Sequence, residues 1–330
     1  MRFRKLGPSG IEASVVALGT WVAGGGSVWG QTPAEDDIIR TIHAALDAGI
    51  TLIDTAPGYG FGRAETLIGK AIRGRRDKVV IATKCGLVWD APGVDHFAVD
   101  GKVLRRNLHP ESIRRECEQS LQRLGVDQID LYQTHWPEAD KTPISETMEC
   151  LVSLKDEGKI GAIGVCNVTP DELKENLAAG PVCSDQLRYS LLWRSAENDV
   201  LPVCRQNALA TLAYQPLEQG LLTGKVTMQT SYGPSDIRSH EGWNPWFTPD
   251  KRRAVLKMLD GWKPLATKYR CTLAQLVVAC TAAQDGITHV LCGARRPEQA
   301  RENAAAGDLN LDPVDVQRMT DESRLLNRTA

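Results

Sequence analysis

The sequence predicts an α/β fold in which residues 1–330 form one closed (β/α)8 barrel, also called a TIM barrel. Eight short apolar runs alternate with stretches of helical periodicity, which is the pattern of parallel β-α units. No linker, low-complexity tract or change in composition divides the chain, and this favours a single closed barrel domain over an open doubly wound sheet. Polar side chains lie where several runs end, and the carboxyl ends of barrel strands form the ligand site.

The first elements are an N-terminal β-hairpin and a buried strand. Two alternating runs flank residues 7–10 (GPSG), which favours a hairpin before a strand over 15–19. Thr32 and Glu35 have the spacing of a capping box, and this predicts a helix that ends near Gly49. The next elements are expected to be strand 51–54, helix 64–72, strand 79–83, a long loop through 89–101, a helix from about 110, and strand 129–132.

The second half repeats the same alternation. Thr169 and Glu172 form another capping box. The expected elements are helix 142–158, strand 160–165, strand 182–186, helix 196–207, strand 210–214, a long excursion over 217–249, helices 249–269 and 273–283, strand 288–291, and a helix that starts at 297. Long loops therefore follow several strands at the carboxyl end of the barrel.

Composition narrows the class of protein. The formal charge of −2 gives no electrostatic reason to expect nucleic acid or a membrane surface as a partner. No apolar run approaches the length of a membrane span, and no signal peptide is recognisable, so we expect a cytoplasmic protein. The nine cysteines include no C-x-x-C pair, so they predict neither a metal site nor a disulfide framework. Cys85 and Cys166 could still be reactive thiols, because each adjoins a polar strand end.

Four titratable residues follow the second, third and fourth strands. Asp54, Lys84 and His135 end strands, and Tyr59 lies on the glycine-flanked loop after Asp54. A tyrosine donates a proton more readily when a cation near its hydroxyl stabilises the ionised form. Lys84 could supply that cation, Asp54 could hold Lys84, and His135 could donate a hydrogen bond to a carbonyl oxygen. Such a set would polarise a substrate C=O group.

Each of these residues also has an ordinary structural explanation. A tyrosine among glycines is commonly a loop residue, an aspartate at a strand end commonly caps the next helix, and a lysine there commonly reaches solvent. The four positions would nevertheless surround one mouth of a barrel. Their combination therefore favours a catalytic site.

The order and spacing of several motifs resemble the aldo-keto reductases, especially bacterial members similar to the general-stress and inositol-cluster reductases. The resemblance extends through RKLGPSGIEAS, DTAPGYGFGRAE, IATK, SLQRLGVDQIDLYQTHWP, LKDEGKIGAIGVCN, LEQGLLTGK and CGARRPEQARENAAA. It implies a catalytic tetrad of Asp54, Tyr59, Lys84 and His135. Tyr59 would be the general acid in reduction and the base in oxidation.

A hydride has to come from a cofactor, because no side chain supplies one. The segment 58–63 (GYGFGR) lacks the last glycine of a G-x-G-x-x-G fingerprint, so it does not predict a Rossmann site. The resemblance instead implies NADPH or NADP+ across the barrel mouth. Asn167 and Gln186 would hold the nicotinamide carboxamide and Tyr214 would stack on the ring. Cys166 is also expected to be a cofactor-binding residue, although it departs from the serine that relatives often have there.

The other cofactor contacts are likewise implied by the resemblance. Arg295 and Arg296 precede a helix, where two guanidinium groups and a helix N-terminus suit the 2′-phosphate of NADPH. A solvated surface is the ordinary explanation of such a pair, and NADH remains a weaker alternative cofactor. The remaining cofactor-binding residues are expected to be Gly19, Thr20, Trp21, Asp54, Gln215, Pro216, Leu217, Gly220, Leu222, Lys225, Gly293, Gln299, Glu302 and Asn303.

The expected substrate pocket is lined by rings. Trp21, Trp89 and Trp136 follow strands one, three and four, and segment 226–249 is expected to act as a lid. Packing under long loops is the ordinary explanation of these tryptophans. Rings with polar edges would suit a sugar or a small aromatic carbonyl.

The sequence therefore predicts an NADPH-dependent reductase of aldehydes or ketones, with small carbonyls or polyols as its partners. The same residues would also serve an NADP-dependent sugar or polyol dehydrogenase working in the reverse direction. A redox-sensing module is a third interpretation, similar to the potassium-channel β subunits that share the fold of this family and bind NADPH.

Overall fold

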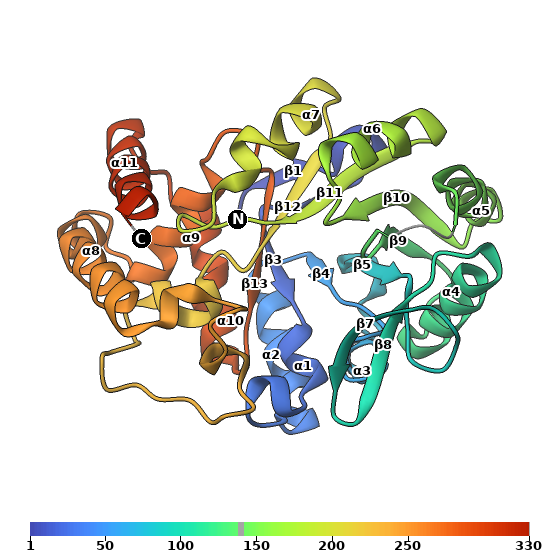
Figure 1. Ribbon diagram of the computed structural model, residues 1–330, viewed down its shortest axis with the longest axis horizontal. Helices are drawn as coiled ribbons and strands as arrows, with labels where there is room; N and C mark the ends of the chain where they lie inside the picture. The colour runs from blue at the N-terminus through green and yellow to red at the C-terminus, as the bar shows by residue number, and fades with distance from the viewer. Residues whose placement is uncertain (138–141, 330) are drawn as a thin grey trace.

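A closed barrel of eight parallel strands forms the centre of the molecule. The structure is a computed structural model that describes residues 1–137 and 142–329. The barrel strands are β3 (Val16–Gly19), β4 (Leu52–Asp54), β5 (Val80–Cys85), β9 (Ile129–Thr134), β10 (Ile160–Cys166), β11 (Val182–Arg188), β12 (Ala210–Tyr214) and β13 (His289–Gly293). They pair in chain order, and β13 pairs with β3 to close the ring (Figure 1). The predicted (β/α)8 barrel is therefore confirmed.

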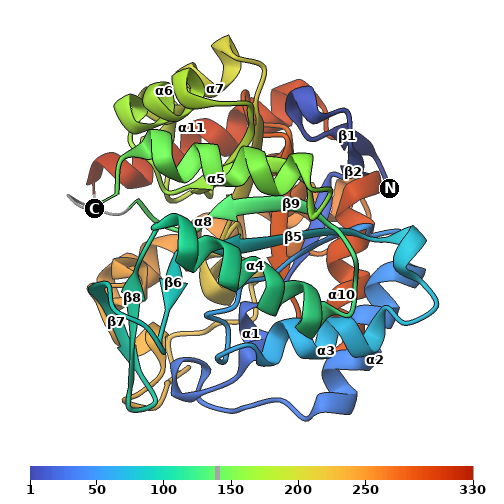
Figure 2. The ribbon, with the colours of Figure 1, turned by 90° about the vertical axis from the view of Figure 1, so that its right-hand side faces the viewer.

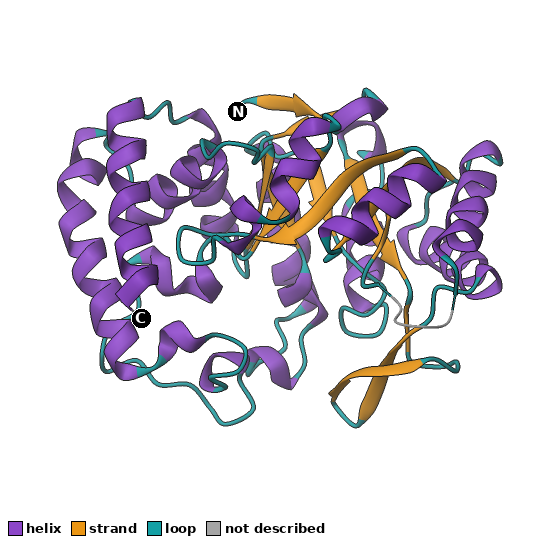
Figure 3. Cartoon of the chain, turned by 45° about the horizontal axis from the view of Figure 1, so that its top comes forward, coloured by secondary structure: helices purple, strands orange, loops and turns teal. Residues whose placement is uncertain are grey.

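Helices surround this barrel (Figure 3). The α-helices are α1 (Trp21–Gly24), α2 (Glu35–Asp47), α3 (Arg63–Ala71), α4 (Pro110–Leu124), α5 (Ile144–Asp156), α6 (Pro170–Ala179), α7 (Val200–Gln206), α8 (Pro249–Lys268), α9 (Leu273–Ala282), α10 (Pro297–Ala305) and α11 (Pro313–Thr329). Short 3₁₀ turns cover Gly7–Ser9, Ser27–Trp29, Arg76–Lys78, Ser195–Asn198, Glu218–Thr223, Ile237–Ser239, Pro245–Phe247 and Ala306–Asp308. Helix α11, which was not predicted from the sequence, packs against α8. Trp262 of α8 is buried there and donates to Glu322 over 2.6 Å.

The predicted N-terminal hairpin is present, and it closes one end of the barrel. Strands β1 (Phe3–Lys5) and β2 (Glu12–Ser14) pair in antiparallel fashion. Leu6 and Ala13 are fully buried among the small inward-facing side chains of the barrel strands. The barrel is therefore filled at this end, and an open mouth remains only at the carboxyl ends of the strands among the described residues.

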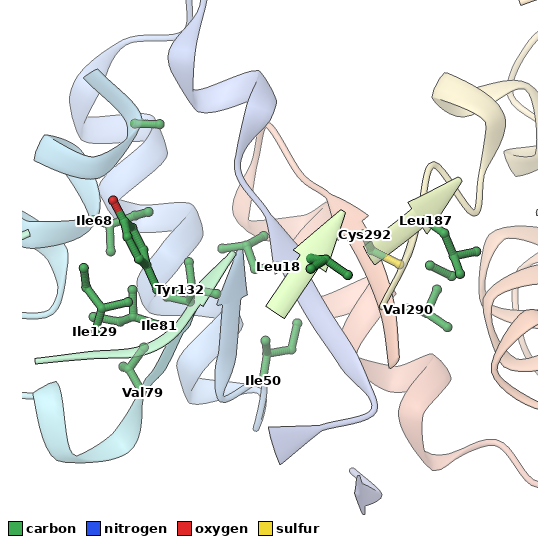
Figure 4. Packing of buried hydrophobic residues seen from close by; sticks show 14 of the residues in the cluster. Leu18, Ile50, Ile68, Val79, Ile81, Ile129, Tyr132, Leu187, Val290 and Cys292 are labelled. Carbon is green, nitrogen blue, oxygen red and sulfur yellow. The ribbon is translucent and has the colours of Figure 1, made fainter. Parts of the chain in front are cut away.

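The side chains that point outward from the strands form the larger core. Ile81, Ile129 and Tyr132 pack with Ile68 of α3 between the sheet and the helices (Figure 4). All four are fully buried, and burying a side chain of this size stabilises the fold by about 1.5–3 kcal/mol. This packing holds neighbouring strands in register and so fixes where their carboxyl ends lie.

Only one of the two predicted capping boxes exists. The Thr169 hydroxyl oxygen accepts a hydrogen bond from the Glu172 backbone N–H, and the Glu172 carboxylate accepts one from the Thr169 backbone N–H, so the box at α6 is confirmed. The box at Thr32 is wrong, because α2 begins at Glu35 and Ala34 is its N-cap residue. The Thr32 hydroxyl instead accepts from the Gly26 N–H over 3.0 Å, within the loop after α1.

The loop expected over 89–101 is also wrong, because this region contains a small antiparallel sheet. Strands β6 (Leu87–Val88), β8 (Lys102–Arg106) and β7 (Val94–Val99) pair in this order, and the sheet projects from one side of the barrel (Figure 2). Asp100 and Gly101 both have positive φ, as a two-residue type I′ hairpin requires. The Asp-Gly pair between alternating runs was the signal that could have revealed this hairpin.

No helix among the described residues has the length and apolar character to span a membrane.

Candidate active site

At the barrel mouth, Lys84 contacts two of the other three predicted catalytic groups, Asp54 and Tyr59. Lys84 Nζ lies 2.8 Å from Asp54 Oδ1 and 3.0 Å from Oδ2, and it donates to the Thr55 carbonyl over 2.8 Å. Its distance to the Tyr59 hydroxyl is 3.4 Å. Lys84 is fully buried, and Asp54 is nearly so. The lysine therefore links a carboxylate to the tyrosine hydroxyl without access to solvent.

Tyr59 is placed by a close approach of two loops. Gly60 has φ +65°, and a Cβ there would lie 2.2 Å from the Gly24 carbonyl oxygen. Glycine at both positions lets the loop after β4 rest directly on the loop after β3. The Tyr59 ring stacks at 6.2 Å on Trp21 and meets His135 edge-on at 5.9 Å. The structure thus brings all four predicted residues to one place.

Two amides that support Asp54 complete this cluster. Gln186 Nε2 donates to Asp54 Oδ2 over 2.7 Å, and Gln133 Nε2 lies 3.5 Å from the same oxygen. Both glutamines are buried. Gln133 was missed by sequence reasoning, although it lies two residues before His135 on the same strand face. The Asp54 carboxylate therefore has donors on both oxygens.

Burial and the ion pair set the protonation states. Burial raises the pKa of Tyr59 to about 12, although the Lys84 ammonium acts in the opposite direction. Burial alone would lower the pKa of Lys84, but the Asp54 carboxylate, together with Tyr59 and Cys166, outweighs burial, so this pKa is raised. Burial, with Lys84 beside it, holds the pKa of His135 well below its usual range. At neutral pH the site therefore has a neutral tyrosine, a charged lysine and a neutral imidazole.

The two cysteines singled out from the sequence are not activated. Burial raises the pKa of the Cys85 thiol and that of the Cys166 thiol well above the ordinary value. A neighbouring cation lowers a thiol pKa only when it outweighs desolvation, and here it does not. All nine cysteines are free.

A cavity of about 890 Å³ opens above Tyr59 and His135. Most of the predicted cofactor-binding residues line it, namely Gly19, Thr20, Trp21, Asp54, Asn167, Gln186, Tyr214, Gln215, Pro216, Leu217, Gly220, Lys225, Gly293, Arg295, Arg296, Gln299, Glu302 and Asn303. Cys166 and Leu222 do not line it. Both are fully buried, Cys166 in the barrel wall and Leu222 in the apolar cluster beneath α8.

At the end of the cavity near Tyr59, polar side chains interlock. The Tyr214 hydroxyl donates to Asn167 Oδ1 over 2.8 Å, and Asn167 Nδ2 donates to the His135 carbonyl over 3.0 Å. Asn167 has φ +59°, in the left-handed region that asparagine tolerates better than most residues. The three residues therefore form a fixed polar wall beside the catalytic group.

The opposite end of the cavity is built on α10. Arg295 N donates to Gln299 Oε1 over 2.8 Å, and Asn303 Nδ2 donates to the Gly293 carbonyl over 3.1 Å. Lys225 pairs with Glu302 over 2.8 Å. Arg295 is half-buried and Arg296 is exposed. This end therefore presents two guanidinium groups and a helix N-terminus to the same space.

Comparisons with known proteins agree with this geometry. Residues 15–323 match the model of the Aldo/keto reductase family. The chain belongs to the aldo/keto reductase family. It is 44% identical over 326 residues to an NADH-specific methylglyoxal reductase of Escherichia coli (strain K12), with 98% of each chain covered.

Solved structures are similar throughout the chain. A glycerol dehydrogenase of Gluconobacter oxydans matches with a TM-score of 0.85 at 36% identity, covering 97% of this chain and 94% of the other. An aldo-keto reductase of Klebsiella pneumoniae in complex with NADPH matches with a TM-score of 0.72 at 26% identity, covering 99% and 96%. The family resemblance, the barrel and an NAD(P)-dependent oxidoreductase acting on carbonyl groups are thereby confirmed.

One of the three tryptophans predicted to line the pocket of this aldo/keto reductase does not line it. Trp21 and Trp136 line the cavity, but Trp89 does not. The Trp89 ring instead packs edge-on against Phe61 at 5.5 Å.

The hairpin supplies side chains that sequence reasoning missed. His96 lies 4.9 Å from the Trp136 ring, and Phe97 lies 5.2 Å from the Trp243 ring of the segment before α8. All four line the cavity.

Among the residues that the structure describes, no group of three or more His, Cys, Asp or Glu side chains could hold a metal ion.

Proposed function

We propose that this aldo/keto reductase reduces a small aldehyde or ketone with a nicotinamide dinucleotide. The observation that carries the proposal is the buried Lys84, which connects Asp54 to the Tyr59 hydroxyl at the mouth of the large cavity. When bound, the dinucleotide supplies the hydride. Tyr59 is the proton donor, and Lys84, held in place by Asp54, stabilises the tyrosinate that remains.

The protonation states support these roles. A pKa of about 12 keeps the Tyr59 hydroxyl protonated at neutral pH, so it has a proton to give to the carbonyl oxygen. The lowered pKa of His135 keeps that imidazole neutral, and a neutral ring offers one N–H donor. Its Nδ1 is buried without a hydrogen-bond partner in the described part of the chain. His135 then orients the carbonyl and Tyr59 protonates it.

The donor set of the cavity fits a dinucleotide. Asn167 and Tyr214 stand beside Tyr59 and suit the carboxamide and the ring of nicotinamide. Arg295 and Arg296 at the start of α10 suit a phosphate. We propose NADPH as a cofactor on this basis, supported by the similar Klebsiella structure with NADPH. NADH is the second candidate, since the Escherichia coli relative carries the name of an NADH-specific enzyme.

The natural substrate is proposed only as a class. The rings of Trp21, Trp136 and Phe97 form apolar walls, and His96 adds a polar edge. Such a pocket suits a short carbonyl compound with one further polar group. Oxidation of a polyol by the same residues is the second candidate, which the similarity to a glycerol dehydrogenase favours.

The proposal is tested by replacing Tyr59 with Phe. Tyr59→Phe should retain cofactor binding, followed by fluorescence titration, while reduction falls about 10²–10⁴-fold. The matched control is Tyr269→Phe, because Tyr269 follows the last residue of α8 and packs against the apolar cluster there, outside the cavity lining. This control should leave turnover unchanged. Normal turnover by Tyr59→Phe would remove Tyr59 from the mechanism.

A panel of carbonyls and polyols, assayed with each nicotinamide cofactor, separates the candidate functions. Fast reduction of carbonyls supports the reductase, and faster oxidation of polyols supports the dehydrogenase. Tight cofactor binding with slow turnover on every compound would favour a redox-sensing module.

A further inference from the structure

A buried carboxylate pairs with one of the arginine side chains that line the cavity. Asp236 is buried in the segment between β12 and α8, which Figure 1 shows running from the barrel toward α1. Its side chain holds Arg238 by two contacts, Nε to Oδ1 at 2.8 Å and Nη2 to Oδ2 at 2.6 Å. Arg238 also lies 4.0 Å from the centre of the Tyr232 ring and lines the cavity.

Arg238 and Arg295 meet at one ring. The Arg238 guanidinium lies 6.0 Å from the centre of the Trp29 indole, and the Arg295 guanidinium lies 5.6 Å from it. Arg295 also donates to the Trp29 carbonyl over 3.0 Å. Three segments far apart in the sequence therefore converge here, and they bring two guanidinium groups and one carboxylate together.

Asp236 stays ionised in this position. Burial alone would raise the pKa of Asp236, but the contacts to Arg238 and the nearby Arg295 outweigh burial and hold it below its ordinary value. One negative charge therefore offsets one of the two positive charges that Arg238 and Arg295 bring to the cavity. A 2′-phosphate gains from uncompensated guanidinium charge, whereas a ribose 2′-hydroxyl does not.

We propose that Asp236 determines cofactor selectivity by weakening the preference for a 2′-phosphate, so that the site accepts NADH as well as NADPH. This inference rests on the proposed function, which places the adenosine ribose at the start of α10. The carboxylate acts through Arg238 and Arg295, so Asp236 is a positioning and charge-tuning residue. It has no contact with the reacting atoms.

The test measures binding of two adenosine fragments to the whole protein by calorimetry. The fragments are 2′,5′-ADP, which has the 2′-phosphate, and 5′-AMP, which lacks it. In Asp236→Asn the dissociation constant for 2′,5′-ADP should fall by about three- to tenfold, because a unit charge near a phosphate has an effect of this order. The constant for 5′-AMP should stay within about twofold. The advantage for 2′,5′-ADP should shrink as salt is raised.

The substitution is chosen to keep the local fold. Asp236 Oδ1 accepts from the Arg238 backbone N–H over 3.0 Å, and asparagine can accept the same bond. Asp236→Ser is a second variant that keeps a capping oxygen and lacks the charge. The matched control is Asp250→Asn, which removes one negative charge from an exposed ion pair with Arg253 on α8.

The possible outcomes distinguish a failure of the inference about Asp236 from a failure of the proposed function. Equal changes for both fragments, or weaker binding of 2′,5′-ADP to Asp236→Asn, would show that Asp236 only holds the segment in place, and the inference would be overturned. The same gain in Asp250→Asn would attribute the effect to net charge and would also overturn it. A wild-type protein that binds neither NADPH nor NADH would overturn the proposed function itself.

Discussion

Replacing Lys84 with Met tests whether the catalytic cluster is a coupled buried ion pair. The substitution keeps a side chain of similar length and removes four contacts, two to Asp54, one to Thr55 and one to Tyr59. Asp54 then remains buried without its cation. Breaking a buried pair in this way costs about 3–5 kcal/mol of unfolding free energy. Lys84→Met should therefore be less stable than the wild type by an amount of this size.

The double variant Asp54→Asn/Lys84→Met separates charge from packing. It removes both charges, so it should regain about 2 kcal/mol or more relative to Lys84→Met. Urea unfolding followed by tryptophan fluorescence at pH 7 measures both differences. Lys159→Met is the surface control, since Lys159 also contacts two carboxylates but is partly exposed, and it should lose only a small part of that stability.

Two results would contradict a coupled ion pair between Asp54 and Lys84. The first is a loss of less than about 1 kcal/mol in Lys84→Met, which would mean that Asp54 finds other compensation. The second is a double variant as unstable as Lys84→Met, which would assign the loss to packing. Either result would also weaken the role of Lys84 in stabilising ionised Tyr59.

Three further predictions concern pH, a helix cap and the arginine pair. Burial raises the pKa of Glu116 to about 8, so the folded protein keeps a proton that the unfolded chain loses above about pH 4.3, and the stability due to this group falls as pH rises between these values. The melting temperature of Glu116→Gln relative to that of the wild type should therefore increase from pH 5 to pH 8.5. A constant difference between the two melting temperatures over this range would contradict the prediction. Thr169→Ala should cost about 1 kcal/mol in urea unfolding and more than Thr32→Ala, because only Thr169 caps a helix; equal losses would argue against the cap. Replacing Arg295 and Arg296 with Ala should raise the dissociation constant for NADPH much more than that for NADH, and equal losses in a binding titration would reject a 2′-phosphate site there.

The barrel could be predicted because its signals are local. Apolar runs and helical periodicity are set by neighbouring residues, so strand and helix order followed from the sequence. The failures had local signals that were outweighed or overlooked. Thr32 and Glu35 fit a capping box, but the preceding loop uses Thr32 to bind Gly26. The turn at Asp100 fits a type I′ hairpin, but the glycine-rich surroundings indicated a loop.

Some features of the candidate site could likewise be predicted from the sequence, and others could not. Asp54, Tyr59, Lys84 and His135 follow strand ends, and a barrel brings all strand ends to one mouth. The direction of the Tyr59 pKa shift could not be predicted in this way, because the sequence suggested that the Lys84 charge would have the larger effect on this pKa. Burial outweighs the lysine and the pKa rises to about 12, since desolvation depends on every side chain packed around the ring.

The order of the elements, the family motifs and the four polar groups at the barrel mouth could all be read from the chain alone. Three features became visible only in the folded molecule: Gln133 supports Asp54, a hairpin forms a wall of the cavity, and Asp236 pairs with Arg238. The two sets of features differ in the sequence distance over which their causes act. Periodicity and strand ends are properties of adjacent residues, whereas charge compensation and burial depend on loops that meet only after the barrel has closed.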